Sequence, residues 1–251
     1  MVNRHISISF CFLFFMSTVT AQVGIGTPMP NSSSVLDIAS TSKGLLPPRM
    51  TKANRNSIAT PPAGLTVWCT NCGDFGEMQV FNGIDWTNMT GGAPAGLEDL
   101  DLFGGGTVVY ILRPSDSGYV RGQVHGLVAA FGNLAEVQWG CHSGPIIGTS
   151  VALGRGYNNT QRITLGCSTL VIAARVCDNL ITNGFSDWHL PSKDELNKVY
   201  EDAFYLNMLT GTYWSSSEIS FSVAWNQNFA NGFQNGASKL GEWFVRPVRW
   251  F

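Results

Sequence analysis

Three charged residues near the carboxyl end are the ones best suited to chemistry. Glu218 follows one predicted strand, and Arg246 and Arg249 lie on the last predicted strand. A carboxylate and a guanidinium group that meet in space form strong, often bidentate, hydrogen bonds. We interpret this set as a structural ion pair, because catalysis needs further groups with perturbed pKa values. Asp187 is a second carboxylate available to pair.

The cysteines offer a second kind of chemistry. Cys69 and Cys72 are compatible with a local disulfide, a redox pair or half of a zinc site, and we favour the disulfide because strand patterns flank the pair on both sides. For a second bridge we favour Cys141 with Cys167. Cys177 falls on the apolar face of a predicted helix, where a buried thiol is common. The sequence itself leaves this pairing open.

Other signatures of catalysis or metal binding are missing from the sequence. Glu98, Asp99 and Asp101 lack the D-x-D-x-D-G order of a calcium loop, which favours a solvated acidic turn. No Ser-His-Asp order, paired catalytic carboxylates or phosphate-binding glycine loop is present. We therefore expect no catalysis, no bound metal and no cofactor, with calcium unsupported by any motif.

The composition favours recognition by a neutral surface. The net charge is −2, only 13% of residues are charged and no Lys/Arg run occurs, which argues against nucleic-acid binding. Aromatic and amide side chains suit stacking and hydrogen bonding to a glycan or protein. Six candidate ligand-binding residues lie on a hairpin predicted from Val223 to Gly236: Trp225, Asn226, Asn228, Asn231, Phe233 and Asn235. The alternative is that the aromatics belong to the core and the Asn/Gly run to a turn.

A capped helix is the strongest structural signal around these residues. Ser192 and Glu195 form an S-x-x-E capping box, which predicts that a helix begins there. The residues that follow at helical spacing form one apolar face: Leu196, Val199, Tyr200 and Ala203. We assign Trp188 and Trp214, on either side of this helix, to the packing of the core.

The chain changes character along its length. Residues 1–21 have the charged start, apolar run and small-residue end of a secretory signal peptide. Residues 22–90 predict a β-rich module with short strands at Val35–Ile38 and Leu45–Leu46 and a brief helix capped by Thr51. Alternation around turn residues predicts a meander of Leu65–Thr70, Glu77–Phe81 and Asp85–Met89, and residues 91–106 predict a linker. After Ala21, no stretch is long and apolar enough to cross a membrane.

Residues 107–251 predict a larger domain with two helices and mixed strands. One helix is expected from Ser168 or Thr169 to Ile181 and the other after Ser192, and residues 143–164 are expected to form a long loop. The strands expected in this domain are Thr107–Leu112, a strand and its return in Tyr119–Ala130, Val137–Cys141, Tyr213–Ser217, Val223–Phe229 and Trp243–Phe251.

The order of motifs in this domain resembles a known family. G-F-S-D-W-H-L-P-S-x-x-E-L, Y-W-S-S-S-E, A-W-N-Q-N-F and V-R-P-V-R follow one another at spacings similar to those of the Lcl C-terminal domain, over Val108 to Phe251. The resemblance implies an α+β, C-type-lectin-like fold, related to formylglycine-generating enzymes, on a secreted or cell-surface bacterial protein. Those enzymes use a late cysteine pair, and here no cysteine follows Cys177. The acidic W-N-D calcium motif of lectins is also missing, since Trp225 is followed by Asn-Gln.

The amino-terminal module resembles the tail-fibre-like attachment modules of bacterial and phage surface proteins. It shares the order V-G-I-G-T, L-D-I, K-G-x-L-x-P-R-M-T and V-x-N-G-x-x-W. In such modules, strands without a core of their own are often completed by other copies of the chain, which suggests a homotrimer. We therefore expect a secreted, adhesin-like protein that binds a glycan or protein ligand, with a structural subunit of a fibre as the alternative and an enzyme on the same fold as the least favoured hypothesis.

Overall fold

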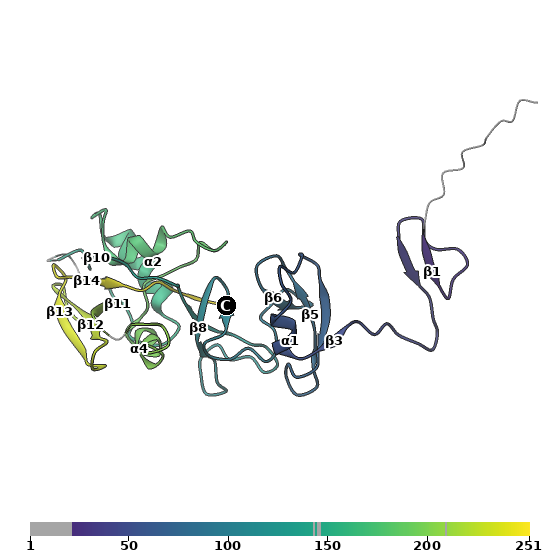
Figure 1. Cartoon of the computed structure of the whole chain (residues 1–251). Helices are drawn as coiled ribbons and strands as arrows, with labels where there is room; N and C mark the ends of the chain where they lie inside the picture. The colour runs from purple at the N-terminus through teal and green to yellow at the C-terminus, as the bar shows by residue number, and fades with distance from the viewer. Residues whose placement is uncertain (1–21, 143, 145–146, 209) are drawn as a thin grey trace, which may run out of the picture. The chain divides into compact units, whose positions relative to one another are not determined.

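The computed structural model describes residues 22–251 except 143, 145, 146 and 209, so the predicted signal peptide lies outside the described residues (Figure 1). The helices are α1 (Lys52–Asn56), α2 (Gly156–Gly166), α3 (Ala173–Asp178) and α4 (Lys193–Glu201). The strands are β1 (Val23–Ile25), β2 (Leu36–Ile38), β3 (Arg49–Met50), β4 (Thr66–Cys69), β5 (Glu77–Phe81), β6 (Trp86–Asn88), β7 (Leu102–Phe103), β8 (Gly106–Ile111), β9 (Gly126–Ala129), β10 (Leu134–Gln138), β11 (Thr212–Glu218), β12 (Val223–Asn228), β13 (Gln234–Ser238), β14 (Glu242–Val245) and β15 (Val248–Trp250). The protein is therefore α+β, as predicted. Among the described residues, no helix has the length and apolar character needed to span a bilayer.

The chain divides into two compact units, one ending at Leu46 and the other running from Pro47 to Phe251. In the first unit, β1 and β2 form a two-stranded parallel sheet. In the second unit, β3-β4-β5-β6 form a sheet in that order, with the antiparallel meander β4-β5-β6 that the alternation predicts. Between β3 and β4, Thr51 caps α1 by accepting a hydrogen bond from the backbone N–H of Asn54.

Two further sheets and three helices form the carboxy-terminal half. One sheet has the order β15-β9-β8-β7 and the other β10-β14-β11-β12-β13. Helix α4 packs against β8, β11 and β12, so it contacts both sheets, while α3 packs on β10 and β11. Trp188 and Trp214 are 1% and 0% exposed, and Trp139 is also fully buried. The large aromatic side chains therefore fill the core between helices and sheets.

The predicted linker is a packed part of the second unit. Residues 91–106 contain β7 and the start of β8, and Gly104, Gly105 and Gly106 are buried. The backbone N–H of Leu100 donates to the carbonyl of Val108, and the N–H of Gly104 donates to Asp85 Oδ2. The glycines are required here by close packing, since a Cβ added at Gly106 would overlap the carbonyl of Ala129. The Gly-rich composition therefore marks close packing and not a free linker.

The prediction of a long loop over residues 143–164 is wrong for its second half, because α2 begins at Gly156. This helix has no side-chain N-cap, and most of its buried side chains are polar. Asn159 and Thr160 bond to Ser150, Ser216 and Leu190 instead of packing as apolar residues. A buried face made of polar residues gives no hydrophobic periodicity, so the sequence did not predict α2. The described residues of the carboxy-terminal domain therefore contain three helices where two were predicted.

Two other boundaries differ from the prediction. Helix α3 is shorter than predicted because Ile172 has an extended backbone and Leu170 and Val171 are exposed. The predicted strand Trp243–Phe251 divides into β14 and β15, which belong to different sheets. Pro247 lies at the division, where its missing N–H would break a continuous ladder. In addition, β13 forms the second strand of the predicted Val223–Gly236 hairpin and extends beyond it.

Candidate functional site

The two-stranded sheet of the first unit has one apolar face. In the parallel register Val23 pairs with Leu36 and Ile25 pairs with Ile38. Partners in register share a face of the sheet, so these four side chains form one apolar face, while Gly24 and Asp37 lie on the other. Each of the four side chains is between 40% and 54% exposed. We call these four residues the β1/β2 apolar face.

The described residues of the first unit leave the β1/β2 apolar face about half-exposed. Parallel sheets in proteins are normally buried on both faces, and a two-stranded sheet is marginal in water by itself. Met29, Leu45 and Leu46 are also exposed, and Leu45–Leu46, which the sequence predicts as a strand, forms no strand. Residues 22–46 thus expose much of their apolar surface and contain no buried hydrophobic residue.

The backbone of the first unit is nevertheless well defined. Gly26 has a positive φ of 76°, and a Cβ at this position would overlap the carbonyl oxygen of Ala39. The loop between the strands is held by Asp37, whose Oδ2 accepts a hydrogen bond of 2.8 Å from the N–H of Asn31. These contacts hold the backbone around β1 and β2, while the β1/β2 apolar face stays about half-exposed.

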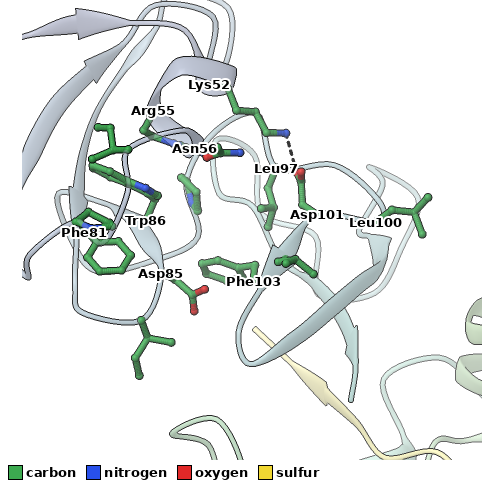
Figure 2. Close-up of a pocket in the computed structure, with 15 residues that line it drawn as sticks. Lys52, Arg55, Asn56, Phe81, Asp85, Trp86, Leu97, Leu100, Asp101 and Phe103 are labelled. Atoms are coloured by element: carbon green, nitrogen blue, oxygen red, sulfur yellow. Dashed lines mark hydrogen bonds and ion pairs between the residues drawn. The ribbon is translucent and has the colours of Figure 1, made fainter. Parts of the chain in front are cut away.

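A cavity of about 490 Å³ lies within the second unit, between α1, the β5–β6 turn and residues 94–103 (Figure 2). Figure 2 shows Arg55, Phe81 and Trp86 on one side and Leu97 and Phe103 on another. The guanidinium of Arg55 lies 5.5 Å from the Trp86 ring and donates to Gln79 Oε1. Burial lowers the pKa of Arg55, with the carboxylates of Asp101 and Glu77 opposing this effect.

The acidic turn beside this cavity is paired within the chain. Lys52 Nζ lies 2.7 Å from Asp101 Oδ2 and 3.6 Å from Glu98 Oε2. Asp101 Oδ2 also accepts from the N–H of Glu98. These carboxylates are thus partly neutralised by an ammonium group. Burial raises the pKa of Asp85 in the cavity wall, against a hydrogen bond from Gly104 and the charge of Arg249.

The structure divides the six predicted ligand-binding residues over two faces and a turn. In the β12–β13 register Asn226 pairs with Asn235, on the face opposite to Trp225. Asn226 is buried, and Trp225 is half-buried under the Lys193 ammonium group, 4.9 Å from its ring. The remaining three residues lie in or next to the turn: Asn228 and Asn231 accept backbone N–H groups of Ala230 and Phe233, and Phe233 is exposed. The six therefore do not form one surface, and their role in binding stays a prediction.

The predicted pairing of Glu218 with Arg246 and Arg249 is wrong. Glu218 Oε2 lies 2.9 Å from the ammonium of Lys239, a fully buried side chain. Arg249 instead binds Asp187 through two bonds of 2.7 and 2.9 Å. The reason is the division at Pro247, which puts Arg249 on a different sheet from Glu218.

Unlike Arg249, Arg246 has no carboxylate partner among the described residues. Its Nη1 donates to the carbonyl of Ala130, and its Nε has no hydrogen-bond partner in the described part of the chain. Burial lowers the pKa of Arg246, while Tyr213 acts in the opposite direction. The residues around β15 therefore contain one buried guanidinium group, that of Arg246, and one ion pair, between Arg249 and the half-exposed Asp187.

Disulfides join the pairs that the sequence analysis favours. Cys69 bonds to Cys72, and Cys141 bonds to Cys167. Cys177 is a free, buried cysteine in α3. Burial, and then the charge of Asp178, raise the pKa of its thiol well above the usual value. A thiol of this kind is a poor nucleophile, so Cys177 acts here as a core residue.

Glu195 is the centre of a buried polar cluster that the capping box reveals only in part. Its carboxylate accepts from the N–H of Ser192 at 2.9 Å, closing the capping box, and from the N–H of Gly156 at 3.2 Å. Trp250 Nε1 donates to Oε1 at 3.0 Å, and His189 Nε2 lies 3.4 Å from Oε2. A Cβ at Gly156 would overlap this carboxylate, which explains a glycine at the start of α2. Glu195 therefore ties α2, α4 and β15 together.

Charge and hydrogen bonding decide the protonation of Glu195. Burial acts to raise its pKa, but His189 and the N–H groups of Ser192 and Gly156 outweigh burial and hold the pKa below its usual range. The ionised carboxylate is therefore the form that the fold stabilises. No signal in the sequence shows that Trp250 and Gly156 are its partners, because both are distant from it along the chain.

Comparisons with known families match both parts of the chain. Residues 24–102 match the family model of the phage tail like trimerisation region, and residues 135–249 match that of the Lcl C-terminal domain. Both resemblances indicated by the sequence motifs are thereby confirmed. A comparison with curated proteins gives no match. Among solved structures, the chain is similar to a fimbrial protein from Bacteroides ovatus ATCC 8483, with 17% identity and a TM-score of 0.37 over 50% of this chain and 35% of that one. The chain thus spans about a third of that protein's length.

Proposed function

We propose that this protein is a homotrimeric, secreted or cell-surface appendage protein with an adhesin-like role. The observation that carries the proposal is the β1/β2 apolar face, which one copy of the chain leaves uncovered. Three copies that pack these faces against one another bury Val23, Ile25, Leu36 and Ile38 in a shared core. At about 25 cal/mol per Å² of apolar surface removed from water, this burial favours assembly.

The family comparisons support a three-copy assembly in particular. The matched region, residues 24–102, is named for trimerisation and contains Ile25, Leu36 and Ile38, three of the four residues of the β1/β2 apolar face. A closed threefold arrangement lets each copy cover the face of the next and leaves no edge free for open-ended growth. The match to the Lcl C-terminal domain supports a surface protein whose second half recognises a ligand.

In this proposal, the carboxy-terminal domain has a C-type-lectin-like fold and binds a glycan or protein without catalysis. Its buried tryptophans and the Glu195 cluster form a rigid body that presents surface loops. The alternative is a structural subunit of a fibre, in which this domain only packs against neighbours. One observation favours that alternative, because the six predicted hairpin residues do not gather on one surface.

Sedimentation equilibrium tests the proposal. Residues 22–251 should have three times the mass of one chain, and residues 47–251, which lack the β1/β2 apolar face, should have the mass of a single chain. A single-chain mass for residues 22–251 contradicts the trimer. If the trimer forms but neither glycan nor protein arrays show binding, the result favours a structural subunit over an adhesin-like protein.

A further inference from the structure

We propose that a groove centred on Trp250 is a binding site for a linear, hydroxyl-rich oligosaccharide. The inference deepens the recognition part of the proposed function and rests on it. The groove is separate from the β12–β13 hairpin, because it is built from β15 and the start of α2, with residues before α4 and after β8 at its sides. Strand β15, which contains Trp250, pairs with β9, and β9 pairs with β8.

One hollow of this groove shares a lining residue with each of two others. Hollows of about 380 and 320 Å³ share Trp250, and a third of about 310 Å³ shares Arg155 with the first. Each volume falls within the range of about 300–1,000 Å³ typical of small-molecule sites. Hollows linked by shared lining residues suit a ligand with repeated units better than a single compact molecule.

Trp250 is held in place from the inside. Its indole N–H donates to Glu195, whose carboxylate also holds the N–H of Gly156 at the start of α2. The ring is half-buried and lines two of the hollows, so it presents a fixed aromatic surface. Tyr157, which is 46% exposed, adds a second ring and packs edge-on against His189 at 6.0 Å. Rigid aromatic rings stack on the C–H faces of sugar rings with little loss of side-chain entropy.

Polar groups with unused hydrogen-bonding capacity line the same groove. Asp187 is fixed by Arg249 through two bonds, and its side chain is still 49% exposed. Arg155 and Asn158 are exposed and make no side-chain hydrogen bond to the described residues. His189 Nδ1 is buried without a hydrogen-bond partner in the described part of the chain, and this side chain lines the second hollow. A buried polar atom without a partner is costly, and a ligand hydroxyl would satisfy it.

The carboxylates of the groove are compensated within the chain, whereas the guanidinium groups of Arg155 and Arg162 in the third hollow have no carboxylate partner among the described residues and can donate to saccharide hydroxyl groups. The carboxylate of Asp187 is balanced by Arg249, and that of Glu195 is buried beside His189. The other hydrogen-bonding side chains, Arg155, Asn158 and His189, are planar and pair well with neighbouring hydroxyl groups. Among the described residues, no three His, Cys, Asp or Glu side chains cluster as metal ligands, so the proposal assigns recognition to direct hydrogen bonds and stacking.

Calorimetric titration of residues 22–251 tests the site. The probes are neutral linear tetrasaccharides of the β-glucan, chitin and mannan types, with a heparin-derived tetrasaccharide as the polyanionic arm. At least one neutral probe should bind, and Tyr157→Ala should weaken that binding about tenfold, which corresponds to one lost ring stack. The matched control is Tyr205→Ala, which removes an exposed ring elsewhere and should leave the affinity unchanged. Asn158→Ala is a second groove variant should Tyr157→Ala fold poorly.

The mass of each sample by sedimentation separates the two proposals. If residues 22–251 form a trimer but no neutral tetrasaccharide binds at millimolar concentration, the groove proposal is wrong and the assembly proposal stands. Binding of the heparin-derived probe alone, or equal affinity in the wild type and both groove variants, also overturns it. Loss of affinity in the groove variants with an unchanged trimer mass supports it.

Discussion

Replacing Glu195 by Gln is the sharpest test of how the carboxy-terminal domain is held together. The glutamate accepts from Ser192, Gly156 and Trp250, and it faces His189. An amide group retains one acceptor oxygen but directs an NH₂ group at donors that then have no partner. The variant therefore removes the negative charge and breaks at least one of the links between α2, α4 and β15.

The size of the effect follows from burial. Glu195 is 0% exposed, and breaking a buried, hydrogen-bonded charge cluster by changing one partner costs about 3–5 kcal/mol. For a chain of this length, each kcal/mol shifts Tm by about 2–4 °C, so Tm should fall by about 6–20 °C. The control is Glu201→Gln on the same helix, whose exposed pair with Lys198 is worth about 0.5 kcal/mol or less.

The pH dependence gives this prediction a second readout. Because the folded pKa of Glu195 lies below its usual value of 4.5, its stabilising effect is fully present above that pH and is lost as the pH falls through the folded pKa. The difference in Tm between wild type and Glu195→Gln should therefore be largest near pH 7 and shrink below pH 4.5. Calorimetry that finds a difference under about 2 °C at pH 7, or one that grows in acid, would refute the reasoning.

Three further predictions concern one disulfide and two single side chains. Replacing Cys141 and Cys167 together by Ser should lower the free energy of unfolding by about 3.5 kcal/mol in denaturant titrations, from the loop-closure entropy of a 26-residue separation; an unchanged midpoint would contradict this. Cys177 should resist a thiol reagent in the native state and react, as one thiol per chain of residues 22–251, only after unfolding in guanidinium; rapid native labelling would show that it is accessible. Burial, with the charges of Asp99 and Glu201, raises the pKa of Asp202 from 3.8 to about 6, so Asp202→Asn should raise Tm at pH 8 and lose that advantage as the pH falls below 3.8, where the acid becomes protonated in both states; equal effects in acid and at pH 8 would argue against the raised pKa.

The sequence predicts elements well where the signal is local. The capping box at Ser192 places the start of α4, and Thr51 places α1, because both caps are made by residues three positions apart. The meander β4-β5-β6 follows from alternation and turn residues. These features depend on neighbours in the chain, so a single sequence contains them.

Features that depend on distant partners were not predictable in the same way. Helix α2 buries Asn159 and Thr160, whose hydrogen-bond partners lie in other segments, so its pattern is read as a loop. Lys239 is fully buried against Glu218, although lysine is the side chain least expected there. Residues 91–106 have the composition of a linker because their glycines allow close packing, not because the chain is free.

The same distinction applies to the candidate sites. The β1/β2 apolar face could be suspected from V-G-I-G-T and L-D-I, but the parallel register that aligns its four side chains comes from the structure. The groove at Trp250 left no sequence motif, because its residues are far apart in the chain. The predicted hairpin site rested on composition, and composition does not state which face of a strand a residue occupies.

The mass in solution of a variant in the β1/β2 apolar face tests the central claim most directly. Light scattering of residues 22–251 with Ile25→Asp and Ile38→Asp should give the mass of one chain, while the wild type and a control with Leu165→Asp, an exposed residue of α2, should both give three times that mass. A trimer that persists in the Ile25→Asp, Ile38→Asp variant, or a wild type that is a single chain, would contradict the account.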